Sequence, residues 1–427
     1  METMDTYLRR KHEELRLLDA CLDRPLASPP PQSIDEVIAL KFKLTAAIRA
    51  QHDLKDWTTT ETAWSHRRKS SDSPFEFRYD YQRADLNVAG PSFYDLGDDI
   101  SCETIYTSSG MASISGLMLA LSHVFLRADM VVLPGTYGET LEFIQGYARY
   151  LNVIPPGGAV LGKPAPNAPH RILLLESCAL AKDFEACLRS SWSQFDLCIF
   201  DTTCFYGGSS RVRRALQKAG RDGVPVVMVR SHTKLDSLGA EYGRLGSTTF
   251  VRCRKKDTWC SSRLGKLAEE MRKAVRLLGG AALPAHFPPY VGNTAYRSLS
   301  AKRVAAMLRN GRRTARHFRK VLGNLTAELD FVHGLYFTLT CRRPLDERGA
   351  RQAASKMSDD IGRAGFPMRH AGSFGFDFAA IEWCHDVHTG GFAVRIAVPD
   401  LPTAIWDAQS SAIAMWWIEH DRALGPR

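Results

Sequence analysis

Three apolar runs separated by helix-length segments constrain the fold of this chain more than any other feature. The runs cover Arg171–Glu176, Phe195–Asp201 and Val224–Ser231. Near-continuous apolar runs suit parallel strands that are covered on both faces, and the segments between them are long enough for crossover helices. The sequence therefore predicts an open α/β sheet with these three runs as parallel strands.

Polar residues follow the end of each predicted strand. Glu176 and Asp201 close the first two runs, and Ser231-His-Thr233-Lys234 closes the third. In open α/β sheets, ligands bind outside the carboxyl ends of the strands. A carboxylate and a lysine delivered to neighbouring strand ends therefore form a candidate site. An ordinary salt bridge between loops is the alternative interpretation of the same residues.

Two further segments have the composition of ligand-binding turns. Ser109-Gly110-Met111 leads into a helix with apolar residues on one face, and the amides of a helix N-terminus favour a phosphate. Tyr137 lies on a glycine-flanked loop directly after the predicted strand 130–133. The alternatives are a simple helix cap at Ser109 and a structural tyrosine at 137.

Length and composition indicate a cytoplasmic protein with more than one core. At 427 residues, the chain exceeds the usual size of a single core, and 44% hydrophobic with 24% charged residues is typical of soluble globular proteins. The first ten residues carry charges where a secretory signal needs an apolar run. No apolar run approaches the roughly 18 residues of a membrane span. We therefore expect no membrane partner.

Charge and cysteine patterns argue against two other classes of protein. The net charge of +10 is diffuse apart from six basic residues between 309 and 320, whose helical spacing suits the solvated face of an amphipathic helix. Without a recognition motif, we expect no nucleic-acid partner. The ten cysteines lack paired Cys-x-x-Cys spacing, which favours reduced core thiols over a disulfide framework or a zinc site.

A possible metal cluster in the last quarter of the chain is also better explained otherwise. Glu382, Cys384, His385 and His388 lie close together in a segment that we interpret as a surface loop, so we expect no metal site. Cys204, directly after the Asp201-Thr-Thr203 segment, is interpreted as a buried bystander thiol.

Taken together, these segments resemble the fold-type I pyridoxal 5'-phosphate (PLP) enzymes of cysteine and methionine metabolism, such as cystathionine γ-synthase and γ-lyase. The resemblance runs from about residue 77 to the C-terminus. The segments that carry it stand in the family's order: Tyr81-Gln-Arg83 with Asn87, Ser109-Gly110-Met111-Ala112, Tyr137-Gly-Glu-Thr140, Asp201-Thr-Thr203, Ser231-His-Thr233-Lys234, and Gly372-Ser373-Phe-Gly375 with Arg395.

The resemblance implies a PLP cofactor and a role for each catalytic residue. Lys234 would form the Schiff base with PLP and move the Cα proton of the substrate. Asp201 would keep the pyridine nitrogen protonated, so that the ring accepts electrons. Tyr137 would stack on the ring and exchange a proton with the substrate or its leaving group.

Binding residues for the cofactor phosphate and the substrate also follow from the resemblance. The expected cofactor-binding residues are Lys234, Gly110, Met111, Tyr137, Asp201, Thr203, Ser231, Thr233, and, from the neighbouring subunit, Tyr81 and Arg83. Arg395 and Ser373 are expected to bind the substrate carboxylate, since an arginine in an apolar strand is costly unless it meets an anion.

The implied architecture is a fold-type I PLP-dependent transferase-like α/β fold. It has an N-terminal helical extension and linker at residues 1–74 and a large, mostly parallel-sheet PLP domain at 75–278. A small C-terminal α/β domain covers 279–427. Because Tyr81 and Arg83 would complete a neighbour's site, the resemblance implies a homo-oligomer, at least a dimer and commonly a tetramer.

Departures from the family pattern indicate a divergent enzyme with an unusual substrate. Leu180 stands where relatives have an asparagine that binds the cofactor's ring oxygen, and the Gly-His pair usual after the lysine is missing. We expect a lyase that eliminates a β- or γ-leaving group from an L-amino acid. One specific candidate is loss of chloride from a chlorinated allylglycine to give propargylglycine. The alternatives are a γ-replacement enzyme like cystathionine γ-synthase, a regulatory protein with a PLP fold, and a nucleic-acid binder.

Overall fold

The computed structural model describes residues 2–60, 67–69, 73–81, 85–97, 100–155, 169–253, 258–329, 331–386 and 391–424. These residues form two compact units. The central unit comprises Arg49–Asp236 and Glu241–Gly292, and the terminal unit comprises Met1–Ile48, Ser237–Ala240 and Asn293–Arg427. The start of the chain, which we expected to be an extension, thus belongs to the same unit as the C-terminal residues.

A seven-stranded sheet is the framework of the central unit. Its order is β4-β10-β9-β8-β7-β5-β6. The strands are β4 (Ile100–Thr107), β5 (Ala128–Val132), β6 (Leu151–Ile154), β7 (His170–Glu176), β8 (Leu197–Asp201), β9 (Val226–Ser231) and β10 (Gly246–Cys253). Strands β6, β5, β7, β8 and β9 pair in parallel, and β10 is antiparallel to both of its neighbours. The prediction of three parallel strands between 171 and 231 is confirmed.

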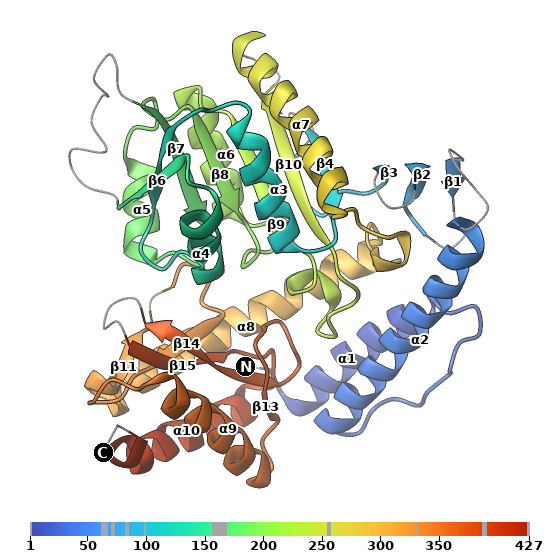
Figure 1. The fold of residues 1–427 in the computed structure, drawn as a ribbon. Coiled ribbons are helices and arrows are strands. Elements are labelled where there is room, and N and C mark those ends of the chain that lie inside the picture. Colours follow the sequence, from blue (N-terminus) through green and yellow to red (C-terminus); the bar gives the residue numbers. More distant parts are fainter. Residues whose placement is uncertain are drawn as a thin grey trace. The chain divides into compact units, whose positions relative to one another are not determined.

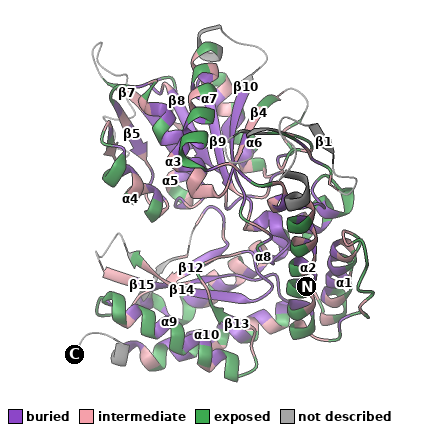
Figure 2. Cartoon of the chain, turned by 45° about the vertical axis from the view of Figure 1, so that its right-hand side comes forward, coloured by how far each residue is buried: buried purple, intermediate pink, exposed green. Residues whose placement is uncertain are grey.

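Helices pack on both faces of this sheet, as Figure 1 shows. They are α3 (Gly110–Ser122), α4 (Gly138–Tyr147), α5 (Ala181–Arg189), α6 (Ser210–Asp222) and α7 (Thr258–Leu278). Leu117 of α3 and Met271 of α7 share a core with Ile199 and Val227 on one face. Phe184 of α5 lies 6.3 Å from the ring of Phe200 on the other face. Coverage from both sides explains why β7, β8 and β9 are almost wholly buried in Figure 2.

A second, three-stranded sheet in the central unit has the order β1-β2-β3. Its strands are β1 (Arg67–Lys69), β2 (Glu76–Tyr81) and β3 (Asp85–Ala89). Sequence reasoning did not identify these strands, nor β4 and β6. Their short or polar segments lack the apolar runs that mark the buried parallel strands.

The terminal unit is built from a five-stranded sheet of order β11-β12-β15-β14-β13 and the helices that accompany it. Its elements are α1 (Met4–Asp19), the first part of α2 (Ile34–Thr60), α8 (Thr294–Val321), β11 (Thr326–Glu328), β12 (Tyr336–Leu339), α9 (Glu347–Arg363), β13 (Met368–His370), β14 (Ala379–Asp386), β15 (Gly391–Ala397) and α10 (Thr403–Leu424). The small C-terminal α/β arrangement expected from the sequence is confirmed, together with the fold class. None of the described helices combines the length and apolar character needed to cross a lipid bilayer.

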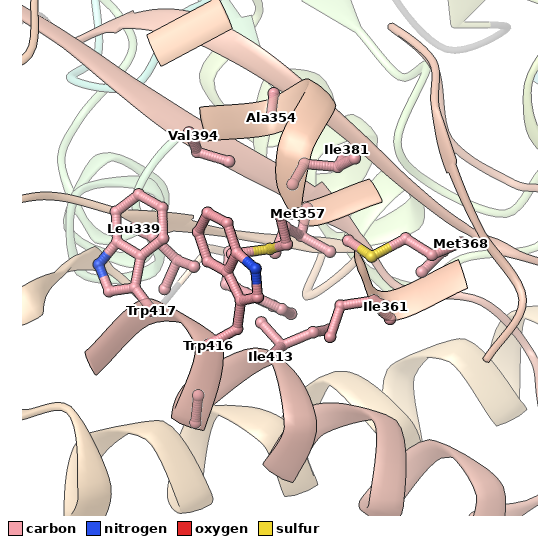
Figure 3. Packing of buried hydrophobic residues seen from close by; sticks show 14 of the residues in the cluster. Leu339, Ala354, Met357, Ile361, Met368, Ile381, Val394, Ile413, Trp416 and Trp417 are labelled. Carbon is pink, nitrogen blue, oxygen red and sulfur yellow. The ribbon is translucent and has the colours of Figure 1, made fainter. Parts of the chain in front are cut away.

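Side chains of α9 and α10 pack against one face of the five-stranded sheet. Figure 3 shows Met357 of α9 and Trp416 of α10 side by side beneath Ile381 and Val394 of the strands. The indole of Trp416 also donates a hydrogen bond to the Asp360 carboxylate, at 2.8 Å. This packing buries the apolar face of each element and gives the terminal unit a core of its own.

Seven charged side chains are enclosed in the terminal unit. This buried charge cluster consists of Arg10, Lys11, Glu14, Lys41, Arg303, Asp377 and Asp400. Lys11 Nζ lies 2.6 Å from Asp377 Oδ1 and 2.7 Å from Asp400 Oδ2, and Lys41 Nζ lies 2.5 Å from Glu14 Oε2. The cluster joins α1 and α2 to α8 and to the segments that flank the β14–β15 hairpin. It therefore fixes the N-terminal helices as structural parts of the unit.

The charge cluster makes stability depend on pH. Burial by itself raises the pKa of the Glu14 carboxyl, but the ammonium groups of Lys11 and Lys41 hold this pKa at about 2. A carboxyl whose pKa is lower in the folded state stabilises the fold above its ordinary pKa, here 4.5. That contribution is lost as the pH falls from 4.5 through about 2.

We therefore expect Glu14→Gln to lower the free energy of unfolding by roughly 3 kcal/mol at neutral pH, from the size of the pKa difference. The variant should also show a shallower loss of stability as the solution is acidified. Urea unfolding across this pH range measures both effects. The control is Glu347→Gln, which removes the exposed partner of Arg351 and should cost less than about 1 kcal/mol. Equal losses in the two variants would contradict a structural role for the cluster.

Candidate functional site

The carboxyl ends of the parallel strands bring the predicted site residues of the central unit together. Glu176 at the end of β7 is directly opposite Asp201 at the end of β8, and β9 ends at Ser231. Strand β5 pairs with β6 on one side and with β7 on the other, so the order of the strands reverses between β5 and β7. Ligands of open α/β sheets bind outside the carboxyl ends near such a reversal.

The first turn of α3 is docked against the end of β9. Ser109 is the N-cap, and its Oγ accepts a hydrogen bond from the Ala112 N–H at 3.0 Å. A Cβ atom on Gly110 would lie 2.8 Å from the Ser231 Cβ. A Cβ on Gly246 would lie 2.1 Å from the Ser109 carbonyl oxygen. Only glycine at these two positions lets the helix N-terminus approach the sheet so closely.

Three hydroxyl-bearing residues link the ends of β8 and β9. The Ser231 N–H donates to Thr203 Oγ1 at 3.0 Å, and the hydroxyls of Ser231 and Thr233 are 2.9 Å apart. Thr203 also donates its N–H to the Asp201 carboxylate at 2.7 Å. The structure thus places Asp201, Thr203, Ser231, Thr233, Gly110 and Met111 at the same edge of the sheet.

A buried ion pair holds the turn that carries Lys234. Arg230, four residues before the lysine, and Asp236, two residues after it, form a bidentate pair with distances of 2.7 and 2.8 Å. The same guanidinium donates to the carbonyl oxygens of Thr202 and Phe205. Because both flanks of Lys234 are anchored in this way, the position of its backbone is fixed by the sheet.

His232 extends the network around Lys234. Its two ring nitrogens lie 2.8 Å from Asp236 and 2.8 Å from Ser247 Oγ, and the ring of Phe93 lies 3.8 Å away. Burial lowers the pKa of His232, although Asp236 opposes the shift. The imidazole is therefore neutral at physiological pH. His232 contacts the same Asp236 oxygen, Oδ2, as the Arg230 Nε.

The amine of Lys234 faces a carboxylate that is supplied by its own loop. Lys234 Nζ lies 3.7 Å from Glu241 Oε1, and both side chains are partly exposed. Glu241 has a backbone φ of 47°, in the left-handed region that residues other than glycine seldom adopt. The strained backbone keeps an anion close to the lysine amine.

Two buried carboxyls share the edge of the sheet. Burial raises the pKa of Asp201, although the hydrogen bonds from Thr203 and the charge of Arg230 lower it. Burial also raises the pKa of Glu176, and the nearby Asp201 raises it further. The raised pKa of each carboxyl favours either a bound proton or a cationic partner beside the carboxylate.

Glu176 also fixes the loop that carries Tyr137. The Tyr137 N–H donates to Glu176 Oε2 at 2.6 Å, at the start of α4. Gly135 in this loop has a φ of 86°, and its Cα faces the turn after β7 near the Cys178 carbonyl and the Leu180 N–H. Leu180 is buried in that turn. The loop and the turn therefore lie side by side at the place where the order of the strands reverses, between β5 and β7.

The predicted substrate residues Arg395 and Ser373 belong to the terminal unit. Arg395 on β15 pairs with Glu382 on the adjacent β14, with Nε to Oε1 at 2.9 Å, and its guanidinium lies 4.7 Å from the ring centroid of Tyr336. The anion that offsets the cost of Arg395 in its strand is therefore a protein carboxylate. Ser373 is partly exposed, and its part in carboxylate binding stays a prediction.

Tyr81 and Arg83 cannot be compared with their expected roles. Tyr81 ends β2, but its side chain lies outside the described residues, as does the whole of Arg83. The homo-oligomer that they imply stays a prediction.

One sequence interpretation of the last quarter of the chain was wrong. Residues 382 to 385 lie in strand β14, not in a surface loop, because they pair with β15 along their whole length. His388 lies outside the described residues. Within the described part of the chain, no group of histidine, cysteine, aspartate and glutamate side chains has an arrangement that suits a metal ion.

A pair of cysteines at the edge of the sheet escaped the sequence analysis. Cys178 Sγ and Cys204 Sγ lie 3.5 Å apart, in the turns that follow β7 and β8. The two residues are 26 positions apart and have no motif spacing. The signal that would have found them is that each cysteine follows closely after a strand-ending carboxyl, Glu176 or Asp201, and these two carboxyls lie opposite each other in the sheet.

Comparison with known proteins identifies the fold. No protein-family model and no curated protein sequence matches the chain. The solved structure of cystathionine gamma synthase from Xanthomonas oryzae pv. oryzae in complex with cystathionine superposes with a TM-score of 0.50 at 16% identity, over 74% of this chain and 82% of that chain. An aromatic amino acid aminotransferase from Burkholderia cenocepacia has a TM-score of 0.44 at 17% identity, over 74% and 75%. The first likeness confirms that the chain has the fold-type I architecture expected from the sequence.

The Arg230–Asp236 pair gives a testable prediction for the site. Asp236→Ala leaves a buried guanidinium without its carboxylate, so the free energy of unfolding should fall by about 3–5 kcal/mol. The matched control is Asp95→Ala, which removes the exposed partner of Arg213 and should cost less than about 1 kcal/mol. Urea denaturation measures both variants. If Asp236→Ala were as stable as the control, the turn around Lys234 would not depend on this pair.

Proposed function

We propose that this chain is a PLP-dependent enzyme that acts on an L-amino acid. The observation that supports this most strongly is the convergence of Lys234, Asp201 and the first turn of α3 at the carboxyl edge of one sheet. These supply an amine, a buried carboxylate and a helix N-terminus. The fold shared with cystathionine gamma synthase adds to this support.

The residues at the N-terminus of α3 fit the phosphate of PLP. The first N–H groups of a helix have no acceptor within the helix, and Ser109 caps the N–H of Ala112. The N–H groups of Gly110 and Met111 are thus suited to a phosphate, as are the hydroxyls of Ser231 and Thr233. The positive end of the helix dipole favours the same anion.

The residues at the strand ends fit the rest of the cofactor. A charge on the buried Asp201 is unfavourable without a partner of opposite sign. A protonated pyridine nitrogen would supply that positive charge. Lys234 extends from the turn between Arg230 and Asp236, and its amine is the group that would bond to the cofactor. Tyr137 has a backbone anchored by Glu176, which suits a ring stacked on the cofactor.

The chemistry divides between the cofactor and the chain. When bound, PLP supplies an electron sink for negative charge at the Cα atom of an amino acid. Lys234 then takes the proton from Cα and returns it elsewhere on the substrate. The Tyr137 hydroxyl exchanges a proton with the departing group. Glu241 Oε1 lies 3.7 Å from the lysine amine, so its carboxylate borders the space around that amine.

More specifically, we propose that the reaction eliminates a β- or γ-leaving group, with loss of chloride from a chlorinated allylglycine as the leading case. Leu180 supports a changed pocket, because a buried apolar side chain replaces a polar partner beside the loop of Tyr137. A pocket altered at this wall is expected to favour a short side chain with a good leaving group over the long side chain of cystathionine.

The cofactor assignment predicts a covalent attachment at one residue. Purified protein incubated with PLP should show the visible absorbance of bound cofactor, and borohydride reduction should fix the added mass on the peptide that contains Lys234. Lys234→Ala should lose both signals. The control is Lys273→Ala, which removes a half-exposed lysine of α7 and should keep them. Absence of bound PLP, or label on another lysine, would overturn the assignment.

The reaction assignment predicts a substrate order. Cystathionine, methionine and a chlorinated allylglycine are offered to the PLP-loaded protein at equal concentration, and the products are followed by mass. We expect the chlorinated substrate to turn over fastest and to give propargylglycine and chloride. Faster turnover of cystathionine or methionine would reject the halide proposal and leave the PLP assignment standing.

A further inference from the structure

Two cysteine thiols meet at the edge of the central sheet. Cys178 lies in the turn after β7 and Cys204 in the turn after β8, with 3.5 Å between their sulfur atoms. Cys204 is 3% exposed, whereas Cys178 is partly exposed. One thiol is therefore open to a reagent in solution, and the second is within reach of the first.

The backbone on both sides of this pair is held by the sheet. The Ser177 N–H donates to the Asp201 carbonyl oxygen at 2.9 Å, and the Cys204 N–H donates to Ser177 Oγ at 2.9 Å. The two turns are thus bonded to each other next to the thiols. A disulfide needs its sulfurs about 2 Å apart, so closure asks for a further approach of roughly 1.5 Å. Side-chain rotation can supply most of this movement.

We propose that Cys178 and Cys204 form a reversible disulfide, and that a small soluble disulfide is the oxidant. The Cys178 thiolate attacks one sulfur of the small disulfide and releases one small thiolate, which leaves a mixed disulfide on Cys178. The Cys204 thiolate then attacks Cys178 Sγ, closes the bond and releases the second small thiolate. The two thiol protons pass to the released thiolates. The pair loses two electrons, and the small disulfide gains two.

The proposed disulfide joins two turns that border the candidate site. The turn of Cys178 packs against Gly135, whose loop carries Tyr137, and the turn of Cys204 follows Asp201 and Thr203. The part of the roughly 1.5 Å approach that side-chain rotation does not supply moves the turns themselves and changes the spacing between them. Oxidation therefore lowers the uptake of PLP, a consequence that rests on the proposed function.

Disulfide mapping tests the bond without any cofactor. The folded protein is incubated with oxidised glutathione, remaining thiols are alkylated, and the chain is digested with trypsin without reduction. We expect the peptides of residues 172–182 and 190–211 to be joined, with fragmentation placing the bond on Cys204 and not on Cys198. Reduced glutathione should separate them. Thiols at Cys178 and Cys204 that stay fully alkylatable, or a bond to Cys198, would overturn the proposal.

Variants separate the two steps of the exchange. In Cys204→Ser, the mixed disulfide with glutathione should accumulate on Cys178, because no second thiol resolves it. In Cys178→Ser, Cys204 should stay a thiol, because it is buried. The exposed Cys102 is the internal control for a thiol that forms only a mixed disulfide. Equal accumulation on Cys178 in Cys204→Ser and in the unmodified chain would show that Cys204 does not act.

The functional consequence has its own readout. PLP uptake by the oxidised and the reduced protein is compared by visible absorbance, with Cys178→Ser treated in parallel. We expect a several-fold drop in uptake on oxidation of the unmodified chain and no change in the variant. Equal uptake in both states would overturn the consequence. No uptake in either state would overturn it together with the proposed function, and the peptide mapping decides the bond independently.

Discussion

The in-register parallel pairing of β7 with β8 and of β8 with β9 is the constraint on which the candidate site depends. Parallel strands present all their carboxyl ends at one edge, so residues far apart in the sequence arrive together there. This pairing sets Glu176 opposite Asp201 and brings Ser231 next to Thr203. The first turn of α3 can join them only because Gly110 and Gly246 lack a Cβ. A slip in register would separate the carboxyls, the hydroxyls and the helix end at once.

Buried charge is used differently in the two units. Around Lys234, the Arg230–Asp236 pair is small and geometrically specific, and it fixes one turn beside the candidate site. In the terminal unit, the buried charge cluster joins three helices and two loop segments of one body, and the ammonium groups of Lys11 and Lys41 lower the pKa of the Glu14 carboxyl. Burying an ion is costly, so each arrangement persists only because every charge has close partners of opposite sign. The first supports a site, and the second supports the fold of the unit.

The partner of Arg395 changes the view of substrate binding. From the sequence, Arg395 is a single arginine in an apolar strand, which predicts that it binds a substrate carboxylate. The structure pairs it with Glu382 across the hairpin, so a carboxylate ligand would compete with a protein anion. Leu180 is an apolar side chain buried in the turn next to the loop of Tyr137. Both observations bear on the proposed substrate, whereas Lys234, Asp201 and the first turn of α3 belong to the proposed cofactor site.

The features of this fold that depend on local pattern could be predicted before the structure was known. Apolar runs specified β7, β8 and β9, the residues that end them identified Asp201 and Lys234, and Ser109-Gly110 marked a helix start, because strand burial and helix capping leave signals within a few residues. Contacts between side chains that are distant in the sequence became evident in the folded chain alone. The Arg395–Glu382 pair, the Cys178–Cys204 contact and the buried charge cluster arise from pairings across long stretches of chain. Such contacts depend on strand order and register, which no short segment encodes.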